Sequence, residues 1–166
     1  TDEETLHDGY SIYDDTVIKL HPNGRWLYGA DRNISPSDIE KINVSSGNAT
    51  YLYDSPYHGD YSMNGDLWFV NNGDQLIVKA GNIFSLSEDS ESDMLYVDAL
   101  SENDDIEDLC YSSENNKIVV LHDNDWYWYS DIPCSNMEIY NSQTYEHIES
   151  VELPMFYKDY EQVQAY

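Results

Sequence analysis

The chain has 166 residues, enough for one domain with a sizeable core, and 40% of its residues are hydrophobic. Its 16 Tyr and 4 Trp indicate a folded protein, because disordered acidic segments usually lack aromatic residues. Seven Lys and Arg stand against 33 Asp and Glu, which gives a formal net charge of −26. This charge repels phosphate backbones and anionic lipid surfaces, so we expect no nucleic-acid partner and no binding to acidic membranes.

The sequence also restricts the compartment. No run approaches the roughly 18 to 20 apolar residues of a membrane span, so we expect no membrane insertion. Residues 1–4 do not resemble a signal peptide. The charge suits surroundings rich in salt or divalent cations, and we expect an extracellular, periplasmic or cell-surface location. Cys110 and Cys134 match no metal-binding spacing, and both a disulfide and two free thiols remain open.

The first predicted elements form a hairpin. Residues 1–8 are acidic and are expected to form a flexible N-terminus, and order is expected to begin near residues 9–13. Residues 16–20 then predict a strand, residues 22–24 (Pro-Asn-Gly) a tight turn, and residues 25–30 the antiparallel partner strand.

Further strands follow in the same manner along the chain. The first set is completed by strands predicted at 38–44 and 49–54. A second set is predicted at 66–70, 75–79, 82–86 and 94–98, with residues 87–93 forming an acidic, solvated loop. A third set is predicted at 106–111, 117–121, 137–141 and 147–153. Each set has the order of a four-stranded antiparallel meander.

The hairpin is repeated along the chain. The segment around Gly24 returns around Gly73, 49 positions later, and more faintly around Asn116, a further 43 positions on. Residues 38–47 and 136–145 also share an alternating strand that runs into a polar turn. A period in the forties with several strands per repeat is typical of β-propeller blades.

In this rhythm the chain resembles WD40-like and YVTN-type β-propellers over nearly its whole length. The resemblance implies an all-β fold with three four-stranded blades and part-blade strands at both ends. The approximate blades are 16–61, 62–105 and 106–159, with 160–166 opening a further blade within a propeller segment that spans 9–166. Three blades do not close a ring. The chain is therefore expected to be part of a larger propeller or of a homo-oligomer, and a β-sandwich or barrel is the alternative fold.

An aromatic stretch is the first candidate site. If this stretch is a strand, Trp126 and Trp128 share one face, while Tyr127 and Tyr129 share the other. Such aromatic side chains make a stacking platform for sugar rings or for a protein partner. The alternative is that they pack between blades.

Histidine and acidic residues are the other candidates. His58 and Asp60 precede a predicted opening strand and repeat a His7 motif, so in a propeller they lie at the channel mouth and are candidates for binding a metal or transferring protons. Residues 87–93 and 101–108 carry oxygen ligands suited to Ca²⁺, without the spacing of a known calcium loop. Ordinary turn residues and solvated charge runs are the alternatives.

No motif of a known catalytic site is found in the sequence. The preferred interpretation is a non-catalytic binding module, part or all of an extracytoplasmic β-propeller that recognises a protein or a carbohydrate. One alternative is a propeller enzyme, a hydrolase, lyase or redox protein, with a channel-mouth site that works either without a cation or with one such as Ca²⁺. The other is a purely structural block of blades in a larger surface protein.

Overall fold

A computed structural model describes residues 12–32, 34–100, 105–122, 136–158 and 161–164. The described residues form β-strands and one 3-10 turn, so the predicted all-β fold is confirmed. Among these residues, no helix has the length and apolar character needed to span a lipid bilayer.

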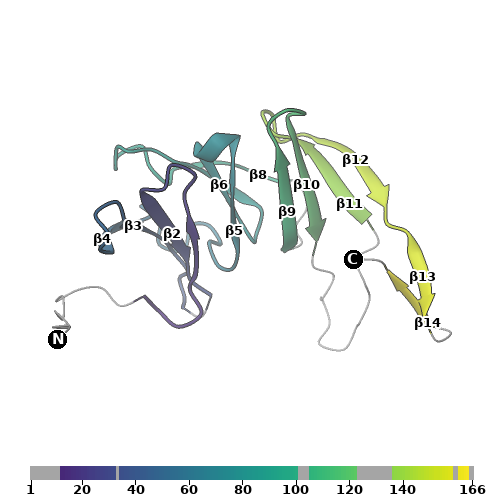
Figure 1. The fold of residues 1–166 in the computed structure, drawn as a ribbon, viewed down its shortest axis with the longest axis horizontal. Helices are drawn as coiled ribbons and strands as arrows, with labels where there is room; N and C mark the ends of the chain where they lie inside the picture. Colours follow the sequence, from purple (N-terminus) through teal and green to yellow (C-terminus); the bar gives the residue numbers. More distant parts are fainter. Residues whose placement is uncertain (1–11, 33, 101–104, 123–135, 159–160, 165–166) are drawn as a thin grey trace.

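Twelve strands form three separate antiparallel sheets of four, each in simple meander order (Figure 1). The first sheet contains β1 (Val17–Leu20), β2 (Trp26–Ala30), β3 (Ile39–Asn43) and β4 (Thr50–Asp54). The second contains β5 (Leu67–Val70), β6 (Gln75–Val78), β7 (Asn82–Ser85) and β8 (Tyr96–Ala99), with the 3-10 turn η1 (Asn71–Gly73) after β5. The third contains β9 (Ile106–Ser112), β10 (Lys117–His122), β11 (Asn136–Asn141) and β12 (His147–Glu152).

A two-stranded hairpin follows the third sheet. It consists of β13 (Met155–Lys158) and β14 (Glu161–Gln164), which pair antiparallel with each other. The strands of the described chain thus form open sheets and no closed barrel.

The first predicted hairpin is confirmed, turn included. The His21 N–H donates to the Trp26 carbonyl at 2.8 Å, and the Gly24 N–H donates to the His21 carbonyl at 2.8 Å. Gly24 has a φ of 71°, a left-handed conformation that glycine adopts without steric cost. The Pro-Asn-Gly sequence therefore defines the local structure that the pattern predicts.

The three sheets share an irregularity that marks them as structural repeats. In each sheet the pairing between the third and fourth strands shifts by one residue, which is a β-bulge. The shifts fall at Lys41/Ile42, Ile83/Phe84 and Ile139/Tyr140. The extra residue on the fourth strand is aliphatic and exposed in all three cases, and these residues are Leu52, Val97 and Ile148. The bulge thus gives a common register for comparing the sheets.

The second sheet lies between the other two and is buried on both faces (Figure 1). In β6, Leu76 and Val78 face the first sheet, whereas Ile77 faces the third. The core on the first-sheet side contains Tyr28, Ala30, Ile39, Met63, Leu67, Leu76, Val78, Phe84 and Met94. The core on the third-sheet side contains Val70, Ile77, Ile83, Leu100, Ile106, Leu109, Ile118, Val120, Tyr140 and Tyr145. A strand covered on both sides has an unbroken apolar sequence for this reason.

The turns of neighbouring repeats also contact each other. His21 Nε2 lies 2.8 Å from the carbonyl oxygen of Gly73, so the first turn and the second are joined by a hydrogen bond. A Cβ at Gly73 would lie 2.7 Å from that same ring nitrogen, and the φ of Gly73 is 96°. The glycine is therefore required both by the backbone conformation and by the close approach of His21.

Candidate binding surface on the third sheet

The third sheet has one face in the core and one that faces away from it. In β10, Ile118 and Val120 point into the core, and the alternation of a strand turns Val119 and Leu121 to the opposite face. Val119 and Leu121 are half-buried, while both core residues have 0% exposure. Both faces of β10 are therefore apolar, which is the pattern of a strand that needs cover on both sides.

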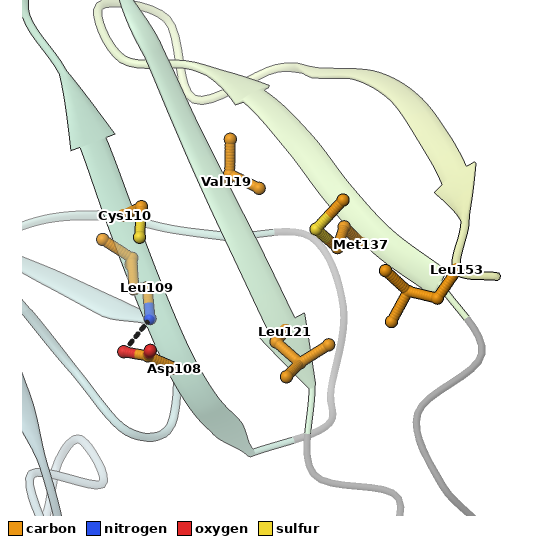
Figure 2. Close-up of a pocket in the computed structure, with 7 residues that line it drawn as sticks. All are labelled: Asp108, Leu109, Cys110, Val119, Leu121, Met137 and Leu153. Carbon is orange, nitrogen blue, oxygen red and sulfur yellow. Dashed lines mark hydrogen bonds between the residues drawn. The ribbon is translucent and has the colours of Figure 1, made fainter. Parts of the chain in front are cut away.

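Neighbouring strands extend the apolar character of this outer face. Val119 lies opposite Cys110 of β9 and Ile139 of β11, and Leu121 lies opposite Met137. Figure 2 shows Cys110, Val119, Leu121 and Met137 around a groove. The volume of the groove is about 200 Å³. The groove is lined by Asp108, Leu109, Cys110, Val119, Leu121, Met137 and Leu153. We call the surface formed by Cys110, Val119, Leu121, Met137 and Ile139 the third-sheet outer face.

The polar groups of the groove are few. Asp108 Oδ1 accepts a hydrogen bond of 2.8 Å from the backbone N–H of Leu109 (Figure 2). The Cys110 thiol is free and its residue is exposed. This surface is suited to bind apolar side chains, because burying them removes hydrocarbon from water without leaving polar groups unsatisfied.

The strand register of the third sheet can be compared with that of the first sheet, residue by residue. When the bulges are superposed, Ile139 of the third sheet aligns with Lys41 of the first. The turns that follow also match, because Asn43 Oδ1 accepts the Ser45 N–H and Asn141 Oδ1 accepts the Gln143 N–H. In this alignment Val119 corresponds to Tyr28 and Leu121 to Ala30. Tyr28 and Ala30 are 1% and 0% exposed, because the second sheet covers them. The third-sheet outer face thus has the position of a face that is buried in the first sheet.

The buried junction between the first and second sheets contains an ion pair that the sequence did not reveal. Lys41 Nζ lies 2.6 Å from Asp93 Oδ2, and the two side chains are 1% and 0% exposed. Lys41 also donates to the Ser87 carbonyl at 2.6 Å. The Tyr53 hydroxyl donates to Asp93 at 3.0 Å. Every strong donor of this cluster has a partner within the protein, so its role is structural.

The same cluster shifts the titration of its tyrosines. Burial raises the pKa of Tyr28, and the Asp93 carboxylate raises it further. The pKa of Tyr53 rises for the same two reasons. Both phenols thus stay protonated at neutral pH and donate to the carboxylate.

A second cavity, of about 300 Å³, lies at the edge of this junction. It is lined by His21, Asn23, Trp26, Tyr28, Gly73, Asp74, Leu86, Ser87 and Glu88. Its main aromatic surface is already in contact with cations, because Arg25 lies 4.7 Å and Lys41 4.9 Å from the centre of the Trp26 ring. Arg25 in turn pairs with Glu88 at 2.7 Å. The internal contacts of Trp26 make this cavity a weaker candidate than the third-sheet groove.

The predicted channel-mouth residues are placed on the surface. His58 Nδ1 lies 3.6 Å from Asp38 Oδ2, and the His58 side chain is 69% exposed. Asp60 is exposed as well. Burial raises the pKa of Asp38, and hydrogen bonding from Ser55 and from the Ile39 N–H opposes that rise. The exposed His58 ring thus lies beside Asp38, whose own side chain is only 14% exposed.

Other predicted site residues lie outside the described part of the chain. These are the aromatic residues Trp126, Tyr127, Trp128 and Tyr129, together with His7 and Cys134. The platform formed by the four aromatic residues stays a prediction.

The prediction of a fully solvated loop at 87–93 is wrong at one residue. Asp93 is buried at 0% exposure, because its carboxylate pairs with Lys41 and accepts the Ser87 N–H at 2.9 Å. The remaining acidic residues of that loop, Glu88, Asp89 and Glu91, are exposed as expected. Within the described ranges, no group of three His, Cys, Asp or Glu side chains is arranged to hold a metal ion.

Comparison of the sequence with models of known protein families and with curated proteins finds no match. The fold and the surface define the protein as an all-β protein with three four-stranded antiparallel sheets and an apolar groove on the third sheet.

Sequence reasoning missed the groove, although the sequence contained a signal for it. Residues 118–121 are four consecutive aliphatic residues, whereas a strand with one solvated face alternates. The run therefore indicated two faces in need of cover, and only one of them is covered by the second sheet.

Proposed function

We propose that this chain is a protein-interaction module of β-propeller type, located outside the cytoplasm, that binds a partner through the third-sheet outer face. The bulge shared by all three sheets and the meander order of each support a propeller-like repeat. The net charge of −26 supports a location rich in salt or divalent cations.

One observation carries the proposal. Val119 and Leu121 are half-buried apolar residues at positions whose counterparts, Tyr28 and Ala30, are buried against a neighbouring sheet. An apolar surface built like a sheet interface is suited to receive another sheet.

The chemistry of the groove favours a protein over a carbohydrate. Its lining is mostly aliphatic and sulfur-containing, and Asp108 is its one charged residue. Sugars are bound by convergent hydrogen-bonding groups around an aromatic ring, and the groove has no aromatic residue among those that line it. A carbohydrate partner stays a prediction that depends on Trp126, Tyr127, Trp128 and Tyr129.

The test uses Cys110 as a reporter at the groove. A photoreactive benzophenone is attached to Cys110 in a Cys134→Ser variant and irradiated in an extract of the source cells and their medium. We expect a discrete cross-linked protein that is then identified, purified and titrated against the unlabelled module. Leu121→Lys is expected to weaken that binding by about tenfold or more, because it places a charge in the apolar contact.

The control variant carries the probe on a remote turn, as Ser46→Cys in a chain with Cys110→Ser and Cys134→Ser. Ser46 is exposed, so a partner specific to the groove is not captured there. Equal capture from both positions, or unchanged affinity in the Leu121→Lys variant, would show that the third-sheet outer face is not the binding surface.

A further inference from the structure

We infer that the partner of the third-sheet outer face is the outer face of the first sheet in a second copy of this chain, packed head to tail. The inference rests on the proposed function and names its partner. The first and third sheets lie on opposite sides of the second sheet, and the β13–β14 hairpin lies beyond the third sheet (Figure 1). On the sides of the first and third sheets that face away from the second sheet, the described residues form no further core cluster.

The outer face of the first sheet is apolar as well. Leu20 of β1, Leu27 of β2 and Ile42 of β3 lie opposite one another in one row, and Ile18 lies on the same face. Ile18 and Leu20 are 48% and 54% exposed, whereas Ile42 is 3% exposed. The solvent-accessible residues of this face therefore lie on β1 and β2, and the part on β3 is buried. We call Ile18, Leu20 and Leu27 the first-sheet outer face.

In the third sheet, the residues that correspond to the first-sheet outer face pack against the second sheet. The bulge register aligns Leu20 with Tyr111 and Leu27 with Ile118. Ile118 is buried and Tyr111 packs against the same cluster, which joins the third sheet to the second. Ile18 corresponds to Leu109, which is 7% exposed, compared with 48% for Ile18.

The first-sheet outer face and the third-sheet outer face therefore correspond to the two sides of one type of sheet-on-sheet interface. The molecule contains this interface twice, between the first and second sheets and between the second and third. The third-sheet outer face corresponds to the side of the first sheet that packs on the second. The first-sheet outer face corresponds to the side of the third sheet that packs on the second. Different faces that fit each other make a heterologous contact, which closes into a ring when the rotation allows. Two copies supply six four-stranded sheets, a number within the four to eight blades typical of propellers.

Because the chain is strongly acidic, self-association has to be measured at high ionic strength. Each chain carries −26, so two copies repel each other at low ionic strength. At about 0.5 M NaCl the screening length falls below about 5 Å, and the apolar contact then decides the outcome. We expect the dimer to strengthen as salt increases.

The experiment measures mass by sedimentation equilibrium over a concentration series in high salt. The first-sheet variant is Ile18→Lys and the third-sheet variant is Leu121→Lys. Each is expected to weaken self-association by about tenfold or more. Leu52→Lys makes the same change in charge at the exposed bulge of β4, a residue that belongs to neither named face, and is expected to associate like the wild type.

Mixing the two variants tests the head-to-tail geometry. A homodimer of either variant has two altered interfaces, whereas a mixed dimer has one altered and one intact. Association is therefore expected to recover when Ile18→Lys and Leu121→Lys are combined. Circular dichroism verifies that each variant is folded, and Leu20→Lys with Val119→Lys forms a second pair if one does not fold.

Three results would overturn this inference. The first is a chain that stays monomeric at about 1 mM, the weak end of the affinity range. The second is self-association that Leu121→Lys abolishes and Ile18→Lys leaves unchanged, which indicates contact between two identical faces. The third is a mixture that recovers no association. In each case, groove-dependent binding of a different protein in the cross-linking experiment would leave the proposed function intact, and its absence would remove both.

Discussion

At the scale of single residues, one cation lies where it joins two sheets. Lys41 is one of only seven Lys and Arg residues, and it lies in the core between two sheets. Its ammonium group contacts Asp93 and lies 5.3 Å and 5.5 Å from the Tyr28 and Tyr53 ring centres. A buried pair of this kind adds little net stability, because desolvation offsets much of the attraction, but removal of one partner leaves the other charge buried and unpaired.

This arrangement leads to a prediction for a double-mutant cycle. Lys41→Met and Asp93→Leu, made singly, are each expected to lower the free energy of unfolding by about 3 to 5 kcal/mol, since each leaves a buried charge without its partner. The double variant is expected to be closer to the wild type than either single one. Urea denaturation followed by tryptophan fluorescence measures all four proteins. Additive losses would show that the two groups do not act as a pair.

At the scale of elements, the turns were predictable and the junctions between repeats were not. Pro22, Asn23 and Gly24 specify a turn by local backbone chemistry, so the sequence is sufficient to predict it. The partner of Asp93 is 52 residues away in the chain, and among 33 acidic residues nothing in the local sequence distinguishes this one. The bulges were also missed, because Leu52, Val97 and Ile148 fit an ordinary strand pattern until the register of the whole sheet is known.

The contact between turns gives a prediction at this scale. Gly73→Ala is expected to destabilise the protein by about 1 to 3 kcal/mol, because the new Cβ requires both a left-handed backbone and displacement of His21. Gly24→Ala is the matched control, since Gly24 also has a positive φ but open space around its Cβ position. Its expected loss is about 1 kcal/mol. Thermal unfolding of both variants gives the comparison, and equal losses would contradict a steric role for His21.

At the scale of the whole molecule, the sequence predicted the repeated four-stranded sheets. It did not predict which faces of those sheets lie on the outside. The period around Gly24 and Gly73 predicted meander sheets, and three such sheets are present. Which face of residues 118–121 is covered depends on the position of the neighbouring sheet, and that position is a tertiary property.

Net charge gives the prediction for the whole molecule. Because 33 acidic residues repel one another, raising NaCl from about 20 mM to about 500 mM is expected to raise the Tm, by about 2 to 4 °C for each kcal/mol of repulsion removed. Differential scanning fluorimetry measures the shift. CaCl₂ and MgCl₂ at equal ionic strength form the control. An additional rise with CaCl₂ would indicate a specific calcium site, and a Tm that salt does not change would contradict the dominance of self-repulsion.

The repeated bulge has a consequence for how this protein avoids uncontrolled polymerisation. β4, β8 and β12 each form one of the two edges of their sheet, and each carries the extra aliphatic residue that interrupts its hydrogen-bonding ladder. An incoming strand that extends such an edge meets a twisted backbone with a misplaced donor and acceptor. At these three edges, growth of the sheets in the hydrogen-bonding direction, which leads to amyloid-like fibres, is thereby discouraged.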